Sequence, residues 1–412
     1  MPGFERCGDT LLCDECSLEE AAARFGTPLY VYSRAALVSA YDAYVQAFAG
    51  VPHRICYALK ANGSGALLRI LAGLGAGADI VSGGELRAAL RAGFPPERIV
   101  FSGVGKTEAE IRAGIEAGIG EFNAESEEEI SRLSTAAVAT GRTARVTLRV
   151  NPDIDPRSHP YISTGLRENK FGVDIAKAPA LLDRARRLPG VEIVGLQCHI
   201  GSQIAELEPL VEAARELAEL SRGLLGEGFP LRSLDIGGGL GVDYEGTGAP
   251  DPAALAAAVL PVVRDLPLTL LLEPGRSLVA GAGALLCRVL YLKKNGGKQF
   301  VIVDAGMNDL LRPALYDAYH RIEPVVLRPS RTVRVDVVGP VCETGDFLAR
   351  DREMSEVGVG DLLAVRDSGA YSFCMSSNYN LRPRAAEVLA EDGRLRLIRR
   401  RETFDDLVAT EV

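Results

Sequence analysis

The sequence lacks the features that would direct it to a membrane, to export or to a nucleic acid. Its 412 residues contain no uninterrupted apolar run of about 18, the length that a membrane-spanning helix needs. The first residues, MPGFERCGDT, lack the basic and then apolar pattern of a signal peptide. The net charge of −9 provides no overall basic surface for nucleic acid or an anionic membrane. We therefore expect a cytoplasmic protein.

The composition is that of an ordinary globular chain. Hydrophobic residues make up 47% and charged residues 25%, which excludes collagen-like, coiled-coil and mainly disordered proteins. Repeats and low-complexity segments are absent, and the length leaves room for two or three domains. The 8 cysteines are scattered, so we expect reduced thiols. Cys13 and Cys16 form a Cys-x-x-Cys pair without a second pair at matching spacing, and we predict no metal site.

Short apolar runs alternate with helical stretches between about residues 54 and 275. The number of runs and helices is that of a (β/α)8 barrel. A doubly wound open sheet shows the same alternation and is the alternative. Capping-box patterns at Thr107/Glu110 and Ser126/Glu129 indicate two helix starts. The predicted strands cover 54–58, 78–81, 98–102, 120–123, 145–150, 192–199, 232–236 and 268–273, and the predicted helices cover 65–75, 84–93, 107–117, 126–140, 176–188, 205–226 and 252–265.

After about residue 280 the strand-like runs are separated by turns rather than by long helices. This pattern indicates a mostly antiparallel β domain, a sandwich or small barrel, following the α/β barrel. We predict a first domain over 36–280 and a second over 281–412, which the N-terminal segment 1–35 joins. The strand-like runs of the second domain are 286–292, 299–304, 333–339, 361–366 and 395–400.

In a (β/α)8 barrel the active site lies at the C-terminal ends of the strands. The first predicted strand leads into Lys60, and we expect its amine to lie in a dry pocket. Desolvation there lowers the pKa of the amine and makes it a nucleophile that can form a Schiff base. A lysine that only extends its charge to water is the alternative. The sixth strand ends in His199 beside a Gly-Ser pair, so we predict a functional histidine. Asp79, in the second strand, either orients Lys60 or satisfies a backbone group. The other histidines are predicted to be surface or structural residues, with His159 as the candidate exception: His53, His159 and His320.

The last two barrel strands end in glycine-containing loops. The segment DIGGGLG (235–241) exposes backbone N–H groups that suit phosphate oxygens, and EPGR (273–276) brings an arginine to the same edge. The loops after strands seven and eight are the recurrent phosphate site of these barrels, although a glycine-rich loop alone also suits a tight turn. A lysine, a histidine, a phosphate cradle and Glu273 together suit pyridoxal 5′-phosphate, whose ring nitrogen a carboxylate keeps protonated.

With these residues the sequence resembles the diaminopimelate decarboxylases, within the alanine-racemase-like (fold-type III) pyridoxal-phosphate enzymes. The resemblance implies decarboxylation of meso-2,6-diaminopimelate to L-lysine and CO2, the last step of lysine biosynthesis, by a homodimer that shares its active sites across the interface. It runs nearly from end to end, through FGTPLYVYS (25–33), YALKAN (57–62), GADIVSGGEL (77–86), FSGVGKT (101–107), NPDIDPRSHPYISTGLRENKFG (151–172), HIGSQI (199–204), DIGGGLG (235–241), EPGR (273–276), RPALY (312–316), CETGD (342–346) and GAY…SSNYN (369–380).

The resemblance also implies a role for each matching residue. Lys60 would bind the cofactor aldehyde, His199 would stack on the ring, and Glu273 would pair with the ring nitrogen. Cys342, the implied proton donor, and Glu343, the implied partner of the distal ammonium, would come from the second subunit. The other implied residues are Ser202, Gly238, Gly239, Gly275 and Arg276 for the phosphate, Arg276 also for the substrate, Arg312 and Tyr316 for the distal end of the substrate, and Tyr371 for both cofactor and substrate.

Two alternatives remain open. Related decarboxylases that act on ornithine, arginine or carboxynorspermidine commonly have aspartate after the cysteine, where this chain has Glu343. A substrate with only an amine at its tail would also leave Arg312 unpaired, at a cost of about 1–3 kcal/mol or more. The second alternative is a pyridoxal-phosphate-binding protein without catalysis. Such proteins are typically a barrel alone, so the region beyond 280 argues against this alternative.

Overall fold

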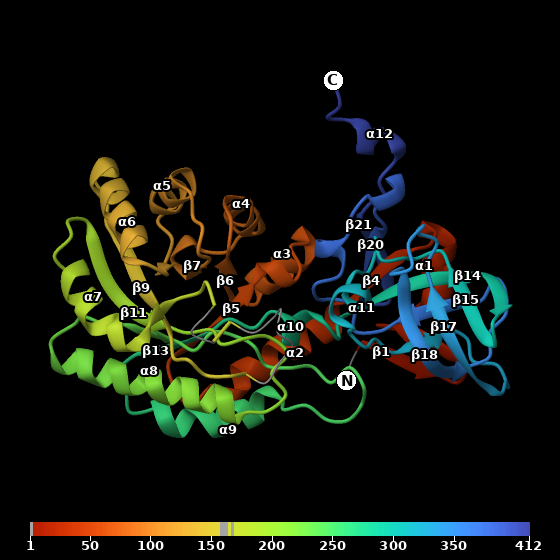
Figure 1. Ribbon diagram of the computed structural model, residues 1–412, viewed down its shortest axis with the longest axis horizontal. Helices are drawn as coiled ribbons and strands as arrows, with labels where there is room; N and C mark the ends of the chain where they lie inside the picture. The colour runs from red at the N-terminus through yellow and green to blue at the C-terminus, as the bar shows by residue number, and fades with distance from the viewer. Residues whose placement is uncertain (1–2, 157–163, 166–168) are drawn as a thin grey trace. The chain divides into compact units, whose positions relative to one another are not determined.

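The computed structural model describes residues 3–156, 164–165 and 169–412. The chain forms two compact units (Figure 1). The barrel unit consists of Tyr41–Val242 and Ala249–Ser277, and the β unit consists of the chain up to Ala40, Asp243–Gly248 and Leu278–Val412. Among the described residues, no helix is both long and apolar enough to cross a membrane.

The barrel unit is a closed (β/α)8 barrel, which confirms the predicted fold class. Neighbouring strands are parallel, β8 pairs with β9, and β13 pairs with β5, so the sheet closes on itself. This closure excludes the open sheet, and β10 (Val173–Asp174) is a short addition beside β9. The barrel strands are β5 (His53–Ala58), β6 (Gly77–Ile80), β7 (Ile99–Phe101), β8 (Glu121–Ala124), β9 (Ala144–Asn151), β11 (Val191–Gln197), β12 (Ser233–Asp235) and β13 (Thr269–Leu272).

Helices surround the barrel strands in the predicted order (Figure 1). Thr107 and Glu110 form the predicted capping box, in which each side chain bonds the backbone N–H of the other. Ser126 accepts from the N–H of Glu129, but the Glu129 carboxylate binds Lys106, so the second predicted box is half formed. The helices are α2 (Arg34–Ala47), α3 (Gly65–Gly73), α4 (Gly83–Ala92), α5 (Glu108–Ala117), α6 (Glu127–Thr140), α7 (Ala178–Ala185), α8 (Glu208–Gly226), α9 (Pro252–Val263) and α10 (Arg276–Val279).

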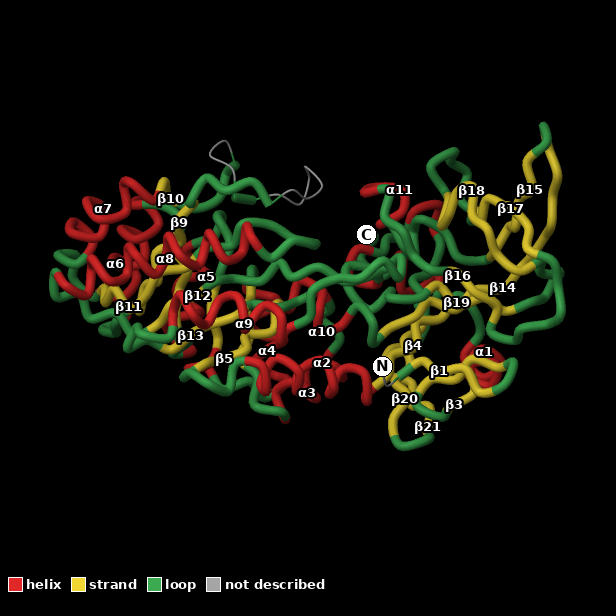
Figure 2. The backbone as a smooth tube through the Cα atoms, turned by 90° about the horizontal axis from the view of Figure 1, so that it is seen from below, coloured by secondary structure: helices red, strands yellow, loops and turns green. Residues whose placement is uncertain are grey.

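The β unit contains the predicted mostly antiparallel sheet, and Figure 2 shows its strands in yellow. Its long strand β14 (Gly283–Asn295) pairs antiparallel with three others, and β4 (Leu29–Ser33) is fully buried beside it. Two pairs, β15–β17 and β4–β20, are parallel. The remaining elements are β1 (Phe4–Cys7), β2 (Thr10–Cys13), β3 (Cys16–Ser17), β15 (Lys298–Val303), β16 (Ile322–Pro324), β17 (Thr332–Val338), β18 (Phe347–Ser355), β19 (Leu362–Val365), β20 (Ala386–Glu391), β21 (Arg394–Arg399), α1 (Leu18–Phe25), α11 (Arg312–Tyr316) and α12 (Phe404–Val408).

Candidate active site

Lys60 lies at the C-terminal edge of the barrel, immediately after β5, in a single 3₁₀ turn. Its Nζ is 2.7 Å from Oδ2 of Asp79, a fully buried carboxylate on β6. The Lys60 side chain is 34% exposed, so this ion pair, rather than the dry pocket expected from the sequence, holds the amine. Of the two predicted roles for Asp79, the structure supports orientation of Lys60.

Glu273 follows β13 and is held by amide groups from two other strands. Its Oε1 accepts from Nδ2 of Asn123 on β8, and its Oε2 accepts from Nε2 of Gln197 on β11, both at 3.1 Å. Burial and the nearby Asp79 carboxylate raise the pKa of Glu273 to about 7. Within the part of the chain that the structure describes, Glu273 has no ion-pair partner. A protonated ring nitrogen is therefore a suitable partner for this carboxylate.

A second buried carboxyl group, Asp235, ends the neighbouring strand β12. Its Oδ1 accepts from the backbone N–H of Gly237 at 2.8 Å. Burial and the Glu273 carboxyl raise the pKa of Asp235 well above its usual value. The buried Glu273 carboxyl therefore makes it less favourable for Asp235 to lose its proton.

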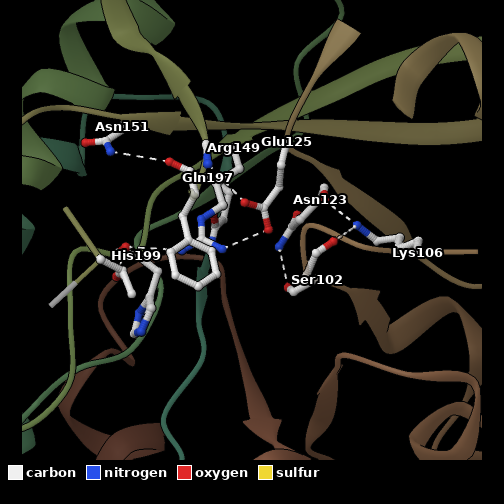
Figure 3. A network of polar contacts seen from close by, with 12 residues as sticks. Ser102, Lys106, Asn123, Glu125, Arg149, Asn151, Gln197 and His199 are labelled. Carbon is white, nitrogen blue, oxygen red and sulfur yellow. Dashed lines mark hydrogen bonds and ion pairs between the residues drawn. The ribbon is translucent and has the colours of Figure 1, made fainter. Parts of the chain in front are cut away.

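Asn123 is itself fixed by a buried lysine (Figure 3). The Nζ of Lys106 donates to the carbonyl oxygens of Asn123 and Gly103, both at 2.8 Å, and pairs with Oε1 of Glu129 at 2.6 Å. Nδ2 of Asn123 also donates to Oγ of Ser102 at 3.0 Å. These positioning residues were not predicted from the sequence, because a lysine directly before a capping box looks like part of a helix start.

His199 follows β11 at the same edge of the barrel. Its Nδ1 accepts from the backbone N–H of Gly238 at 3.2 Å. Burial, together with the charges of Lys60 and Arg149, lowers the pKa of His199 well below its usual value, so the ring is neutral. Arg149 pairs with Glu125 at 2.9 Å and donates to the carbonyl of His199 at 3.4 Å (Figure 3). A neutral ring fixed in this way suits stacking on an aromatic cofactor.

The glycine-rich loop after β12 passes very close to the ends of other strands. A Cβ on Gly238 would lie 2.2 Å from the carbonyl oxygen of Glu273, and one on Gly239 would lie 2.5 Å from that of Gly201. The N–H of Gly238 donates to His199. The N–H of Gly239 has no acceptor among the described residues, so it can donate to a phosphate oxygen. Gly239 has a φ of 109°, which favours glycine.

An arginine and a hydroxyl group lie at the same edge of the barrel unit. The Nη2 of Arg276, which is 7% exposed, donates to Oγ of Ser202 at 3.0 Å. Gly275 is buried directly before Arg276. The structure therefore gathers all the barrel residues of the predicted site at one edge: Lys60, His199, Ser202, Gly238, Gly239, Glu273, Gly275 and Arg276.

Replacing Gly238 with alanine should lower the free energy of unfolding by about 1–3 kcal/mol or more, because the new methyl group would meet backbone. Chemical denaturation would measure the change. Gly223→Ala is the matched control, since Gly223 lies in α8 with open space around it and alanine favours a helix. Equal stability of the two variants would contradict the tight packing of this loop.

The β unit holds the residues predicted for the distal end of the substrate. Arg312 begins α11 and is 4% exposed. Its guanidinium lies 4.7 Å from the ring centre of Tyr244, and its Nη1 is 2.7 Å from Nε2 of His320. Tyr316, at the end of the same short helix, is half-buried. His320 is thus buried and contacts a predicted site residue, which its position in the sequence did not reveal.

Cys342 and Glu343 lie on an exposed loop between β17 and β18. The N–H of Cys342 donates to Oδ1 of Asn380 at 2.9 Å. Buried Asp346 anchors the loop from the other side, where its carboxylate accepts from the N–H of Val341 at 2.6 Å. Both contacts hold the backbone and leave the two side chains on the surface of the unit.

Tyr371 is a bulky residue at a φ of 53°, a conformation that costs about 1–3 kcal/mol and is concentrated at functional sites. It lies after β19, directly past the Gly369–Ala370 pair of the resemblance. Tyr371 is therefore a member of the predicted site whose backbone is strained.

His159, the candidate exception among the histidines, lies outside the described residues.

The barrel edge offers an amine for an aldehyde, backbone N–H groups and an arginine for a phosphate, and a carboxylate held by two amides for a ring nitrogen. These groups fit pyridoxal 5′-phosphate. The fold and the site define the class of the pyridoxal-dependent decarboxylases. The family model described as "Pyridoxal-dependent decarboxylase, pyridoxal binding domain" matches residues 34–280.

Comparison with known proteins narrows this class. The diaminopimelate decarboxylase of Pseudomonas aeruginosa is 52% identical over 411 residues, which cover 100% of this chain and 99% of that protein. The diaminopimelate decarboxylase of Aquifex aeolicus is 50% identical over 99% of this chain and 97% of its own length. A solved structure of the M. jannaschii diaminopimelate decarboxylase in co-complex with L-lysine has a TM-score of 0.94 at 41% identity, covering 100% and 98%. The chain belongs to the diaminopimelate decarboxylases, and its cofactor is pyridoxal 5′-phosphate.

Proposed function

We propose that the protein removes CO2 from meso-diaminopimelate and forms L-lysine, the last step of lysine biosynthesis. The observation that carries this proposal is the buried guanidinium of Arg312, at the start of α11. Diaminopimelate has a carboxylate at the end that does not react, and a buried arginine fork is the partner that such a group requires. The relatives named above are similar to this chain over nearly its whole length, which supports the same reaction.

The barrel residues bind and tune the cofactor. Pyridoxal phosphate, when bound, supplies an aldehyde for amines and a protonated ring that withdraws electrons from the bond that breaks. Lys60, oriented by Asp79, provides the amine that holds it. Glu273, held by its two amide donors, keeps the ring nitrogen protonated. The remaining members of the site would support the ring and the phosphate. His199 would stack on the ring, and Ser202, Gly239, Gly275 and Arg276 would bind the phosphate beside Gly238, whose own N–H donates to His199.

The residues of the β unit bind the substrate and complete the reaction. Arg312 binds the distal carboxylate with Tyr316, and Tyr371 contacts cofactor and substrate. Glu343 pairs with the distal ammonium, and Cys342 returns a proton to the carbon that has lost CO2. We propose that Cys342 and Glu343 act in the site of the other subunit of a homodimer. The cytoplasmic location and the domain division at 280/281, with 1–35 joining the second domain, remain predictions.

The purified protein with pyridoxal phosphate should release CO2 from meso-diaminopimelate and form one L-lysine for each CO2. We expect kcat/KM for ornithine, arginine and carboxynorspermidine to be lower by at least about a hundredfold, because each lacks a group that Arg312 or Glu343 binds. Release from one of these substrates alone would overturn the substrate assignment. Release from none of the four would favour a binding protein without catalysis.

A further inference from the structure

His320, in the β unit, is fully buried and has a hydrogen-bond partner on each ring nitrogen. A guanidinium can only donate, so Nε2 of His320, 2.7 Å from Nη1 of Arg312, is the acceptor. Nδ1 lies 2.8 Å from the carbonyl oxygen of Arg366 and must be the donor there. The two contacts together define a neutral ring with its proton on Nδ1 and its lone pair directed at Arg312.

Tyr244 holds Arg312 from a second direction. Its ring centre is 4.7 Å from the guanidinium carbon, and the same ring meets His320 edge-on, with 5.3 Å between ring centres and an angle of 68°. Tyr244 belongs to Asp243–Gly248, a segment that folds with the β unit although its neighbours in the chain belong to the barrel unit. The guanidinium is therefore held on its face by an aromatic ring and at its edge by an imidazole.

Two guanidinium groups contact His320. Arg312 lies at Nε2, and Arg352 on β18 donates to the backbone carbonyl of His320 at 2.6 Å, whereas Arg366 meets Nδ1 only through its backbone carbonyl oxygen. Burial raises the pKa of Asp367, the next residue after Arg366, and the nearby positive charges, Arg312 among them, only partly oppose this effect. A second proton on the ring would place two positive N–H groups against each other and would remove the acceptor for Arg312.

We propose that His320 is a positioning residue that makes the protein specific for substrates with a distal carboxylate. It orients the Arg312 fork before the substrate arrives, so that less side-chain freedom is lost on binding. This inference rests on the proposed role of Arg312. It adds a residue that touches neither the substrate nor the cofactor and acts only through the arginine.

A matched pair of amide variants tests the proposal. The asparagine side chain in His320→Asn is long enough to bond the Arg366 carbonyl but too short to reach Arg312, whereas the glutamine in His320→Gln extends to the position of Nε2. The ligands are L-lysine, which keeps the distal carboxylate and amine, and cadaverine, which has the same chain without the carboxylate. Calorimetry of the holoenzyme measures both dissociation constants without requiring turnover.

We expect His320→Asn to weaken L-lysine binding about tenfold or more and to change cadaverine binding less than about twofold, because a hydrogen bond to a charged group is lost. KM for diaminopimelate should rise by the same factor while kcat changes little. His320→Gln should restore both constants to within about threefold of the unchanged protein. Thermal unfolding of each variant shows whether the fold is retained.

The possible outcomes separate this inference from the proposed function. Equal weakening of L-lysine and cadaverine by His320→Asn, or no weakening of either, would overturn the positioning role. If His320→Asn does not fold, a folded His320→Gln variant tests the proposal by itself. A tenfold loss of L-lysine binding by the glutamine variant would overturn the positioning role of His320. Failure of the unchanged protein to decarboxylate diaminopimelate would instead refute the proposed function, whatever the two variants bind.

Discussion

Replacing Lys60 with alanine should reduce CO2 release from diaminopimelate by at least about 10⁴-fold, the order of loss seen when a covalent catalyst is removed. The amine is the group at the barrel edge that can form a covalent bond with the cofactor aldehyde, and Asp79 orients it at 2.7 Å. A labelling experiment tests the same role of Lys60 independently of turnover. Borohydride reduction should fix the cofactor permanently on Lys60. Peptide mass analysis should then find the cofactor on the Lys60 peptide of the unchanged protein and on no peptide of the variant.

Lys298→Ala is a matched control for the Lys60 variant. Lys298 is an exposed lysine of the β unit, 63% exposed, and it pairs with Asp336 at 3.0 Å, an interaction worth about 1 kcal/mol or less. We expect this variant to release CO2 within about twofold of the unchanged rate. Full turnover by the Lys60 variant would refute the mechanism, and loss of turnover in both variants would show that the assay reports folding instead.

Replacing Glu273 with glutamine should lower kcat by about 10²–10³-fold, the usual cost of removing one preorganised electrostatic group. A glutamine has nearly the same shape and can keep a contact with Asn123 or Gln197, but it cannot keep a ring nitrogen protonated. Steady-state rates at saturating substrate measure this effect. An unchanged kcat would contradict the assignment of Glu273 to the ring nitrogen.

The raised pKa of Glu273 also predicts how the stability of the cofactor-free protein depends on pH. The pKa of Glu273 is about 7 in the folded protein and near 4.5 in the unfolded chain, so between these values only the folded state keeps the proton. The contribution of this carboxyl to stability is therefore fully present below pH 4.5 and is lost as the pH rises to about 7. The loss is on the order of 3 kcal/mol.

Denaturation of the cofactor-free protein between pH 4.5 and about pH 8 would measure this loss. The glutamine variant should show a smaller decline with pH, because it has no proton to release at this position. Adding pyridoxal phosphate should stabilise the unchanged protein more at about pH 8 than at about pH 5, since a positive ring nitrogen offsets the buried charge. Parallel pH curves for the two cofactor-free proteins would contradict the raised pKa.

The order of strands and helices in the barrel was predictable from the sequence. Each barrel strand is a short apolar run, and each helix has an apolar face, so their positions depend on neighbours in the chain. Thr107 and Glu110 are an example, since both partners of that capping box lie within a single turn. The glycine-rich loop and its place after the seventh strand were predictable for the same reason.

Contacts between distant residues could not be predicted in this way. Ser126 and Glu129 have the same capping pattern, yet the Glu129 carboxylate binds Lys106, which lies on another loop. The amide donors that hold Glu273 come from β8 and β11, which are far from it in sequence. The sequence left two roles open for Asp79, and the choice between them, an ion pair with Lys60, depends on how β5 and β6 align.

The sequence by itself therefore determined the kind of fold, the family and the residue types of the site, because periodicity and motifs are local properties of the chain. The tertiary structure decided that the sheet closes, which carboxyl groups have a raised pKa, and that His320 contacts Arg312. Burial, hydrogen-bond partners and pKa values depend on which side chains meet after folding. No local pattern specifies them, because each results from segments that are distant in the sequence.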